Sequence, residues 1–417
     1  MIHRPGGKLL FATEPLVRQG CPGRKRRAGD EVRDKVEFGG GSQDPMRVCI
    51  DVQPAIAQRA GVGRYTKTLV EHLVPLAGTD EVTLAFFDFK RRGAPFAESR
   101  ATLRPVRWCP GRLLQAAWKT MNWPAFDTLF GRHDVYHFTN FVIPPLRKGR
   151  SVVTIYDMSF HRLPSFAEDR NLRYLEAKVQ QSADRADAIL TISQFSADEI
   201  CEVLAVPASR VFPIHLGIAP DFAAPPDSAV AELRTRFGLD RPYLLNVGTI
   251  EPRKNTGLLF DLLERLSEFD GLLVLAGGRG WKCEPLFERM RNSPHADRIR
   301  YFGFVDDADM PALYAGAELF LFPSFYEGFG LPPLEAMACG APVIASTGGA
   351  LPEVLGDGAR VLESYEPDAW AEAARQLLTD SGAREALVAR GRERAARFTW
   401  EKTARATWEV YRGLASE

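Results

Sequence analysis

Short apolar runs alternate with longer segments of helical periodicity along most of the chain, and this alternation most constrains its fold. In the first half, strand-like runs such as 47–51 (RVCID) and 135–138 (VYHF) are separated by amphipathic segments such as 170–186. Strands that alternate with helices are typical of βαβ units, in which parallel strands are buried on both faces. The pattern therefore predicts an α/β protein with parallel sheets.

The alternation occurs twice. It stops in the Pro- and Ala-rich stretch 211–230 and starts again at 243–250 (YLLNVGTI). A chain of 417 residues is too long for one ordinary core. We therefore expect two doubly wound domains, 46–220 and 221–395, followed by an amphipathic helix within 396–417. Ligands of such sheets bind at the carboxyl ends of the strands, so these ends should face each other across a cleft.

Composition excludes several classes of function. The 53 basic and 53 acidic residues give a formal net charge of zero, so no global field holds nucleic acid. No apolar run reaches the roughly 18 residues that a membrane span needs, and six scattered cysteines favour a reducing, cytoplasmic compartment. The polar, glycine-rich residues 1–45 predict a disordered extension. A basic arm that touches lipid headgroups is the alternative for this segment.

A glycine pair follows the first predicted strand, in 60–70 (AGVGRYTKTLV). Gly61 and Gly63 leave room for a ligand near the backbone, and the start of the helix behind them attracts phosphate or carboxylate. The spacing is not G-x-G-x-x-G, because position 66 is not glycine. A tight strand-to-helix turn accounts for the two glycines equally well.

Two adjacent cations stand after the first strand of the second domain, in 246–259 (NVGTIEPRKNTGLL). Gly248 opens the turn, and Arg253 and Lys254 precede the next helix. An arginine offers a forked donor and a lysine a point charge, which together suit a diphosphate. The alternative is a solvated turn, where most Arg-Lys pairs belong.

Two glutamates stand eight positions apart in 322–346 (FPSFYEGFGLPPLEAMACGAPVIAS). Glu327 is predicted in the loop after a buried strand, and Glu335 in the first turn of the helix that Pro332 and Pro333 begin. Carboxylates of a glycosidase usually come from distant segments on opposite sides of the scissile bond. A single loop-helix unit fits hydrogen bonds to a sugar and a ribose better. The alternatives are a solvated loop acid and a helix-dipole partner.

Four further residues stand at predicted strand ends of the first domain: His137, Asn140, Tyr156 and Asp157. They are candidates for the acceptor side of the cleft. A histidine beside aromatic residues is more often a packed core residue than a catalyst, so His137 is the weaker candidate. Asp157, at the end of a buried strand, is the stronger one.

The segment 322–346 resembles the E-x7-E signature of retaining glycosyltransferases, in particular glycosyltransferase family 4. The segments VGTIEPRKN and GGALPEVLGDGARVLES follow the order and spacing of that family, and the similarity extends from Met46 to about Phe398. Within the family, the chain looks most like the mannosyltransferases that build bacterial surface polysaccharides. The resemblance implies a GT-B fold, with a donor held mainly by the second domain, an acceptor held mainly by the first, and a last helix that crosses back to the first.

The resemblance also implies roles for individual residues. Arg253 and Lys254 would neutralise the diphosphate of a nucleotide-sugar donor such as GDP-mannose. Glu327 would face the transferred sugar, and Glu335 would accept hydrogen bonds from the ribose. The other implied donor-binding positions are the backbone amides around Phe329, Gly330 and Leu331, the glycine loop at Gly61 and Gly63, and Phe304 and Val305 near the base.

One position departs from the family pattern. Many relatives carry His-Asp where this chain has Tyr156-Asp157. The histidine usually approaches the donor sugar, so its role is either taken by the tyrosine hydroxyl or missing.

Together these expectations predict transfer of a hexose with retention of configuration. The transfer is expected to be metal-independent, because no D-x-D element that would bind a divalent ion stands at a predicted strand end. No cofactor is expected. The expected acceptor is a glycan or a lipid-linked oligosaccharide, with peripheral contact at the inner membrane face. The rival hypotheses are a GT-B epimerase or phosphorylase, and a non-catalytic sugar-nucleotide-binding protein. Released nucleoside diphosphate would favour transfer, and net consumption of phosphate would favour phosphorolysis.

Overall fold

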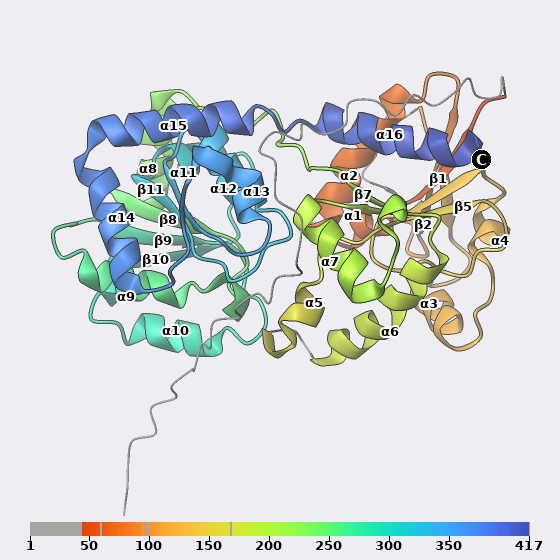
Figure 1. Cartoon of the computed structure of the whole chain (residues 1–417), viewed down its shortest axis with the longest axis horizontal. Helices are drawn as coiled ribbons and strands as arrows, with labels where there is room; N and C mark the ends of the chain where they lie inside the picture. Colours follow the sequence, from red (N-terminus) through yellow and green to blue (C-terminus); the bar gives the residue numbers. More distant parts are fainter. Residues whose placement is uncertain (1–43, 59–60, 95, 97–99, 167–168, 417) are drawn as a thin grey trace, which may run out of the picture. The chain divides into compact units, whose positions relative to one another are not determined.

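Two parallel sheets, each flanked by helices, account for most of the described chain (Figure 1). The computed structural model describes residues 44–416, apart from 59–60, 95, 97–99 and 167–168. The extension predicted for 1–45 therefore lies outside the described residues, except for its last two positions. Among the described helices, none is both long enough and apolar enough to cross a bilayer.

The first sheet has seven parallel strands in the order β3-β2-β1-β4-β5-β6-β7. The strands are β1 (Arg47–Asp51), β2 (Glu81–Phe87), β3 (Thr102–Val106), β4 (Val135–Phe138), β5 (Arg150–Thr154), β6 (Ala188–Thr191) and β7 (Val211–Pro213). The α-helices between them are α1 (Gln53–Ala57), α2 (Val62–Leu73), α3 (Gly111–Thr120), α4 (Phe126–Phe130), α5 (Ser159–Arg162), α6 (Asp169–Arg185) and α7 (Gln194–Leu204).

The second sheet has six parallel strands in the order β10-β9-β8-β11-β12-β13. The strands are β8 (Tyr243–Val247), β9 (Leu272–Ala276), β10 (Ile299–Gly303), β11 (Leu319–Phe322), β12 (Val343–Ser346) and β13 (Arg360–Leu362). Its helices are α8 (Asp227–Phe237), α9 (Gly257–Arg265), α10 (Glu284–Arg291), α11 (Met310–Ala315), α12 (Leu331–Cys339), α13 (Leu351–Leu355), α14 (Pro367–Thr379) and α15 (Ser381–Ala395).

The central strands are buried along their whole length, which explains why they read as continuous apolar runs. All five residues of β9 and all four of β11 are buried. Helices cover both faces of a parallel sheet, so its strands need apolar side chains on both faces. The predicted α/β class with two doubly wound sheets is confirmed.

Both sheets reverse their strand order at one place. In the first sheet β1 lies between β2 and β4, and in the second β8 lies between β9 and β11. Such a switch point separates the loops that follow the two central strands and leaves room for a ligand there. The residues after β8 and β11 include Gly248 and Glu327, so the second switch point carries the predicted donor-site motifs.

Two passages of chain connect the halves, and they contact each other. Ile218, after β7, forms a parallel bridge with Thr399, just before the last helix α16 (Trp400–Ser416). A side chain at Gly217 would approach the Trp400 backbone nitrogen to 2.1 Å, so only glycine fits this crossing. Helix α16 then packs against α2 and β4 of the first half. Tyr411 of this helix bonds to His137 across that contact.

Candidate active site

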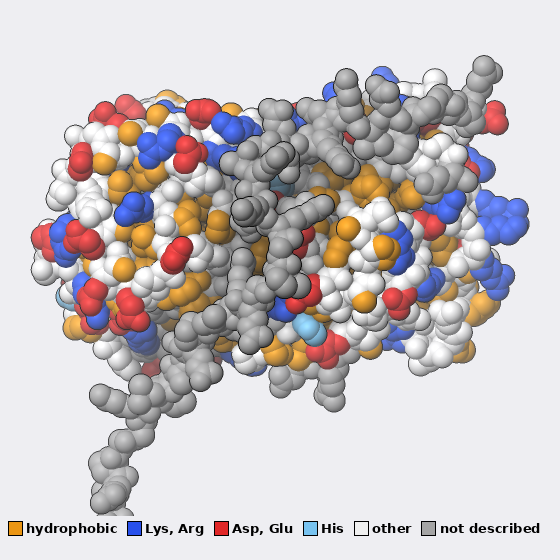
Figure 2. All heavy atoms as spheres, in the orientation of Figure 1, with side chains coloured by type: hydrophobic (Ala, Val, Ile, Leu, Met, Phe, Trp, Pro, Cys, Tyr) orange, Lys and Arg blue, Asp and Glu red, His pale blue; other side chains and the backbone are white. Residues whose placement is uncertain are grey.

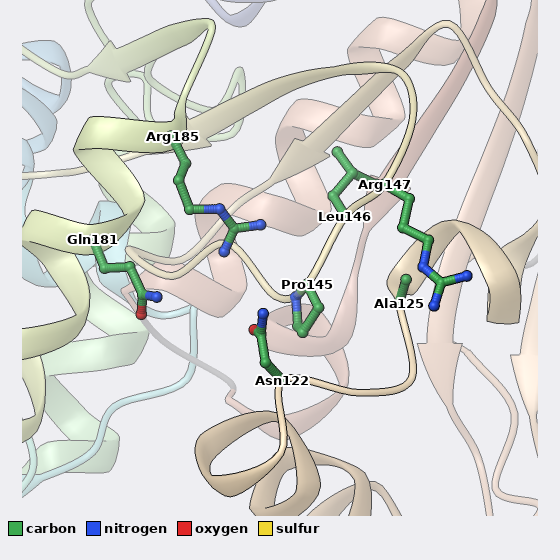
Figure 3. A pocket seen from close by; sticks show the side chains of 7 residues that line it. All are labelled: Asn122, Ala125, Pro145, Leu146, Arg147, Gln181 and Arg185. Atoms are coloured by element: carbon green, nitrogen blue, oxygen red, sulfur yellow. The ribbon is translucent and has the colours of Figure 1, made fainter.

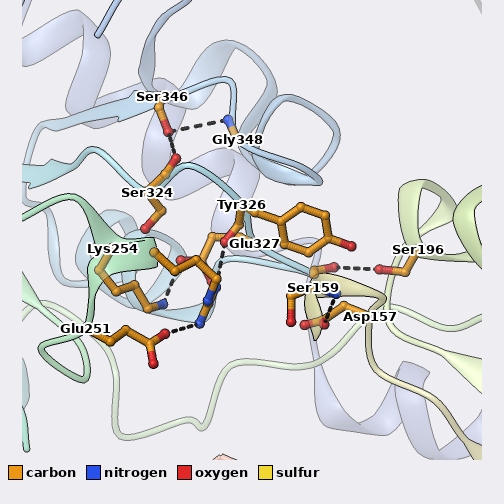
Figure 4. A network of polar contacts seen from close by, with 12 residues as sticks. Asp157, Ser159, Ser196, Glu251, Lys254, Ser324, Tyr326, Glu327, Ser346 and Gly348 are labelled. Atoms are coloured by element: carbon orange, nitrogen blue, oxygen red, sulfur yellow. Dashed lines mark hydrogen bonds and ion pairs between the residues drawn. The ribbon is translucent and has the colours of Figure 1, made fainter. Parts of the chain in front are cut away.

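A buried network of opposite charges occupies the second switch point (Figure 4). Arg253 and Lys254 lie in a one-turn 3-10 helix after β8. Lys254 Nζ is 2.6 Å from Glu327 Oε1, and Arg253 Nη1 is 3.3 Å from Glu327 Oε2. Arg253 also bonds to Glu251 at 2.6 Å. The structure thus joins the cation pair after β8 to the glutamate after β11, which are 73 positions apart in the sequence.

Mutual stabilisation keeps this network charged. Burial opposes ionisation of Glu327, but Lys254 and Arg253 outweigh it and hold the pKa of the carboxyl group below its usual value. Burial likewise opposes the charge of Arg253, yet Glu327 and Glu251 raise its pKa above the usual value. Burial lowers the pKa of Lys254, and the contact with Glu327 offsets part of this effect. A second anion near Lys254 would therefore favour its charged form.

The glycines around this network allow close backbone approach. Gly248 has φ +152°, and a Cβ atom there would lie 3.7 Å from Lys254 Cε. Gly330 has φ +104°, and a Cβ atom there would lie 2.5 Å from Leu351 Cδ2. Gly330 is also the residue before the first turn of α12, and Pro332 and Pro333 lie in that turn as predicted.

The loop between Glu327 and α12 presents backbone amides at a helix start. The Phe329 ring is buried against His215 and Phe398, so its side chain serves the core. The amides of Phe329 and Gly330 donate no hydrogen bond to any described residue. Amides at a helix N-terminus suit an anion or a sugar hydroxyl. Leu331, the first residue of α12, is half-buried beside them.

Glu335 lies in the second turn of α12, which corrects the prediction of the first turn. The helix starts at Leu331, and its first turn contains no acidic residue. Tyr314 Oη donates to Glu335 Oε2 at 3.1 Å. The other oxygen, Oε1, is buried and accepts no hydrogen bond from any described residue. Arg64 Nη1 lies 3.2 Å from this oxygen, and the Asp307 carboxylate acts on the same carboxyl group with the opposite effect on its pKa. Burial raises the pKa of Glu335 to about 7.

Arg64 is a site residue that the sequence reasoning missed. It lies in α2, next to Gly63, and its guanidinium also stands over the Phe222 ring at 5.1 Å. The available signal was a cation in the first turn of the helix behind the glycine pair. The ion pair with Glu335 joins the first half of the chain to α12 of the second half.

The other residues predicted to bind the donor are Gly61, Gly63, Phe304 and Val305, and they lie outside the charged network. Gly61 has φ +57° and precedes the first turn of α2, whereas a Cβ atom at Gly63 would lie 2.0 Å from the Gln58 carbonyl oxygen. This close packing supports the tight-turn interpretation for Gly63. Phe304 is 61% exposed and Val305 is buried in the core. No contact joins these two residues to Arg253, Lys254 or the two glutamates in the described chain.

The loop after β11 also contacts the strand ends of the first sheet. Ser193 Oγ, before α7, donates to the Gly328 carbonyl oxygen at 2.7 Å. Tyr326 Oη donates to Glu199 of α7. A Cβ atom at Gly328 would lie 2.8 Å from Asp157 Cβ. Asp157 therefore lies against the candidate site, as its place after β5 predicted.

His137 and Tyr156 instead lie in the core of the first half. His137 is fully buried on β4, where its two ring nitrogens lie 2.6 Å from Tyr411 Oη and 2.8 Å from Thr154 Oγ1. Burial lowers its pKa to about 3, so the ring is neutral. Tyr156 Oη donates to the Thr139 carbonyl oxygen at 2.6 Å. Tyr156 is therefore satisfied within the first half, and His137 is satisfied by Thr154 and by Tyr411 of α16.

The Tyr156 hydroxyl, at the position where many relatives carry histidine, donates to a backbone carbonyl oxygen. Asn140 follows β4 and is half-buried, with no side-chain hydrogen bond to a described residue. In the described part of the chain, no group of three or more His, Cys, Asp or Glu residues is placed to hold a metal ion.

Comparison with known proteins identifies the family. The model for "Glycosyltransferase Family 4" matches residues 59–222, and the model for "Glycosyl transferases group 1" matches residues 232–394. O-antigen chain mannosyltransferase B of Escherichia coli is 34% identical over 387 residues, which cover 88% of this chain and 100% of that protein. The chain belongs to the glycosyltransferases.

Two further comparisons concern a longer mannosyltransferase and a solved structure. The serotype-specific mannosyltransferase WbdA of Escherichia coli is 33% identical over 257 residues, which cover 59% of this chain and 31% of WbdA. Sucrose-phosphate synthase from Thermosynechococcus elongatus superposes with a TM-score of 0.71 at 22% identity, over 89% of this chain and 99% of that one. The structural match and the two sheets confirm the GT-B fold that the resemblance implied.

Proposed function

We propose that this glycosyltransferase moves a hexose from a nucleoside diphosphate sugar to a hydroxyl group, with retention of configuration. We favour mannose because the two relatives described above are both named mannosyltransferases. The proposed acceptor is a glycan or a lipid-linked oligosaccharide in surface polysaccharide synthesis, reached in the cytoplasm at the inner face of the membrane.

The observation that carries the proposal is the partly buried cation pair at the same switch point as loop amides that donate to no described residue. Arg253 and Lys254 stand at the carboxyl end of β8, and the amides of Phe329 and Gly330 stand after β11. Two cations and two amides at one switch point suit a diphosphate. The oxygen of Glu335 that accepts no hydrogen bond supports a ribose partner, because a buried carboxylate oxygen needs a donor.

These positions suggest how the residues act in the transfer. The leaving diphosphate gains negative charge as the glycosidic bond breaks, and fixed cations stabilise that charge without reorganisation. Glu327 holds both cations in place through its two oxygens. We propose that the leaving phosphate oxygen takes the proton of the acceptor hydroxyl on the same face of the sugar. Retention follows, and no divalent ion is needed beside the cation pair.

A donor screen and product analysis test this proposal. Thermal shifts with GDP-, UDP- and ADP-sugars should single out one donor, since a ligand that binds only the folded state raises its stability. With that donor and a mannan-type oligosaccharide, we expect release of the nucleoside diphosphate, a product of retained anomeric configuration by NMR, and full turnover in EDTA. Inverted product would refute the mechanism, and loss of turnover in EDTA would refute metal independence.

Lys254→Ala tests the role of the cation pair. We expect turnover to fall about 10²–10³-fold, the loss typical when one group that stabilises transition-state charge is removed. Lys254→Arg should recover part of it. Lys67→Ala, which removes a half-exposed lysine paired with Glu71, is the matched control. Circular dichroism checks folding. Near wild-type transfer by folded Lys254→Ala would refute the diphosphate assignment.

A further inference from the structure

The loop that carries Glu327 is held from both halves of the chain. On the side of the second half, Arg253 Nη1 donates to the Tyr326 carbonyl oxygen at 2.5 Å and lies 3.3 Å from Glu327 Oε2. On the side of the first half, the Tyr326 hydroxyl donates to Glu199 of α7. Tyr326 thus joins helix α7 to the arginine of the charged network.

The Tyr326 side chain points away from the charged network. Figure 4 shows its ring extending away from Lys254 and toward the part of the first half that carries Ser196. Tyr326 is 5% exposed, and its ring packs against Phe195 of α7 with the ring centroids 5.6 Å apart. Its hydroxyl also accepts a hydrogen bond from the Met158 amide at 3.2 Å. Because the ring is buried and the hydroxyl has two partners, the backbone at Tyr326 is fixed relative to α7.

Glu199 is itself held in place. It lies in the middle of α7 and is buried, and its other carboxylate oxygen accepts from Arg162 Nε at 2.7 Å. Arg162 also pairs with Glu202, three positions further along the same helix, at 2.9 Å. Glu199 therefore presents one oxygen to Tyr326 from a fixed position. Hydrogen bonds to a charged acceptor are roughly twice as strong as those between neutral groups.

Helix α7 contacts the second half at two further places. The hydroxyl oxygens of Ser193 and Ser196 lie 2.7 Å and 3.4 Å from the Gly328 carbonyl oxygen. The first two amides of α7 donate to the Glu353 carboxylate of α13, each at 2.8 Å. These contacts remain when the Tyr326 hydroxyl is removed. Its removal should therefore loosen the loop without separating the halves.

Other features of the described surface lie apart from these contacts. On the face that Figure 2 shows, acidic and basic side chains are interspersed over the second half, as is common for solvated pairs that contribute little to stability. A hollow of about 310 Å³ in the first half has Arg147 and Arg185 in its lining (Figure 3). It shares no residue with the contacts of Tyr326, so Arg147 can serve as a control position.

We propose that Tyr326 and Glu199 are positioning residues for the transfer reaction. The hydrogen bond between them fixes the loop of residues 325–328, and this loop places Arg253 and Glu327 for the donor diphosphate. A shift of the backbone at Tyr326 would move both the carbonyl oxygen that Arg253 contacts and the adjoining Glu327. A misplacement of about 1 Å can lower a rate about a hundredfold. The inference rests on the proposed function, because it gives the pair a part in that reaction.

Tyr326→Phe tests the pair from the second half, because it removes the hydroxyl and keeps the buried ring. We expect kcat to fall about tenfold to a hundredfold, the range for loss of a hydrogen bond to a charged group. The KM for the donor should change much less, because well-placed cations act mainly on the charge that grows in the transition state. Tyr243→Phe is the matched control. It removes a buried hydroxyl whose bond to the Leu313 carbonyl stays within the second half, and its kcat should be unchanged.

Two variants of Glu199 test the pair from the first half. Glu199→Leu removes the acceptor and should lower kcat as much as Tyr326→Phe does, whereas Glu199→Gln keeps an oxygen for the Tyr326 hydroxyl and should recover most of the loss. The double variant of Tyr326→Phe and Glu199→Leu should be no slower than either single variant, because both remove the same bond. Glu202→Gln, which breaks the other pair of Arg162, and Arg147→Ala in the hollow should leave kcat unchanged.

Amide hydrogen exchange gives a readout that does not depend on transfer. The Phe325 amide donates to the Arg253 carbonyl oxygen at 2.9 Å and reports on the loop. Without donor, peptides that contain Phe325 should exchange faster in Tyr326→Phe and Glu199→Leu than in the wild type and Tyr243→Phe. Unchanged exchange, full turnover by folded Tyr326→Phe, or an equal loss of kcat in Tyr243→Phe would overturn the proposal. Faster exchange in both variants, with no transfer by the wild type, would refute the proposed function while supporting the positioning of the loop.

Discussion

Glu335→Gln should stabilise the glycosyltransferase without donor and, at the same time, weaken its hold on the donor. The carboxyl group is 4% exposed, and one of its oxygens accepts no hydrogen bond from any described residue. Arg64, at 3.2 Å, is the cation that contacts it. A buried charge with so little compensation costs the folded state free energy. Such a cost to stability is expected of a residue that binds a ligand. The ligand would donate the hydrogen bond that Glu335 Oε1 does not receive from the protein.

The pH dependence fixes the sign and size of this cost. The pKa of Glu335 is about 7 in the folded protein, against 4.5 for an ordinary Glu side chain. The unfolded chain therefore loses this proton first, and the free energy of unfolding falls as pH rises from about 4.5 to about 7. Each pH unit in this window is worth up to about 1.4 kcal/mol. Ionised Glu335 thus costs the folded state on the order of 3 kcal/mol above pH 7.

Glutamine removes most of this cost. Its amide oxygen can still accept from Tyr314, and the favourable contact with Arg64 is already included in the raised pKa. The net gain should be about 2 kcal/mol at pH 8 and near zero at pH 5. Urea unfolding of both forms across this pH range measures it. Glu318→Gln, which breaks a surface pair with Arg384, is the control and should leave the pH slope unchanged.

Two results would refute this reasoning. Parallel pH profiles for the wild type and Glu335→Gln would show that the carboxyl group does not titrate abnormally. Unchanged donor affinity would show that it does not bind the donor, because loss of a hydrogen bond to a charged group should cost about tenfold to a hundredfold in Kd.

Three further substitutions test single contacts, two of them between the halves and one within the first half. Gly328→Ala places a Cβ atom 2.8 Å from Asp157 Cβ, so steady-state turnover should fall and small-angle scattering should show a larger radius of gyration. Tyr156→Phe removes the bond to the Thr139 carbonyl and should cost about 1–3 kcal/mol in thermal unfolding with donor affinity unchanged; weaker donor binding would place the hydroxyl at the substrate. Glu353→Gln weakens the hydrogen bonds that the Glu353 carboxylate accepts, each at 2.8 Å, from two backbone amides at the start of α7. It should lower the melting temperature by a few degrees.

The predictable part of the fold is the part set by burial. The runs that became β8, β9 and β11 are buried along nearly their whole length, so their apolar sequences carried the signal. Strand β3 gave none, because its first three residues are exposed and it contains a proline. An edge strand of this kind is stabilised by pairing with its neighbouring strand, and its own sequence need not show an apolar strand pattern.

Some residues of the candidate site could likewise be predicted from the sequence, and others could not. Gly248 and Glu327 follow central strands, so the chain order alone located them at the carboxyl ends of strands, and the strand order of the sheet adds that these ends form a switch point. The pairing of Arg64 with Glu335 joins residues more than 250 positions apart, and no local pattern encodes it. The commitment of Tyr156 to a backbone carbonyl was equally hidden, because a strand-end tyrosine can point either way.

The charges of the site add up to a constraint on how a donor can enter. Three cations, Arg64, Arg253 and Lys254, are paired with Glu251, Glu327 and Glu335. Each of these three cations is already paired with a carboxylate. Under the proposed function, a diphosphate would therefore have to replace carboxylates as the partner of the cations. This exchange would then offset part of the electrostatic gain from the cations, and a hydrogen bond to Glu335 Oε1 would add to the net affinity. We therefore expect the ribose contact to contribute to donor binding beside the diphosphate contact.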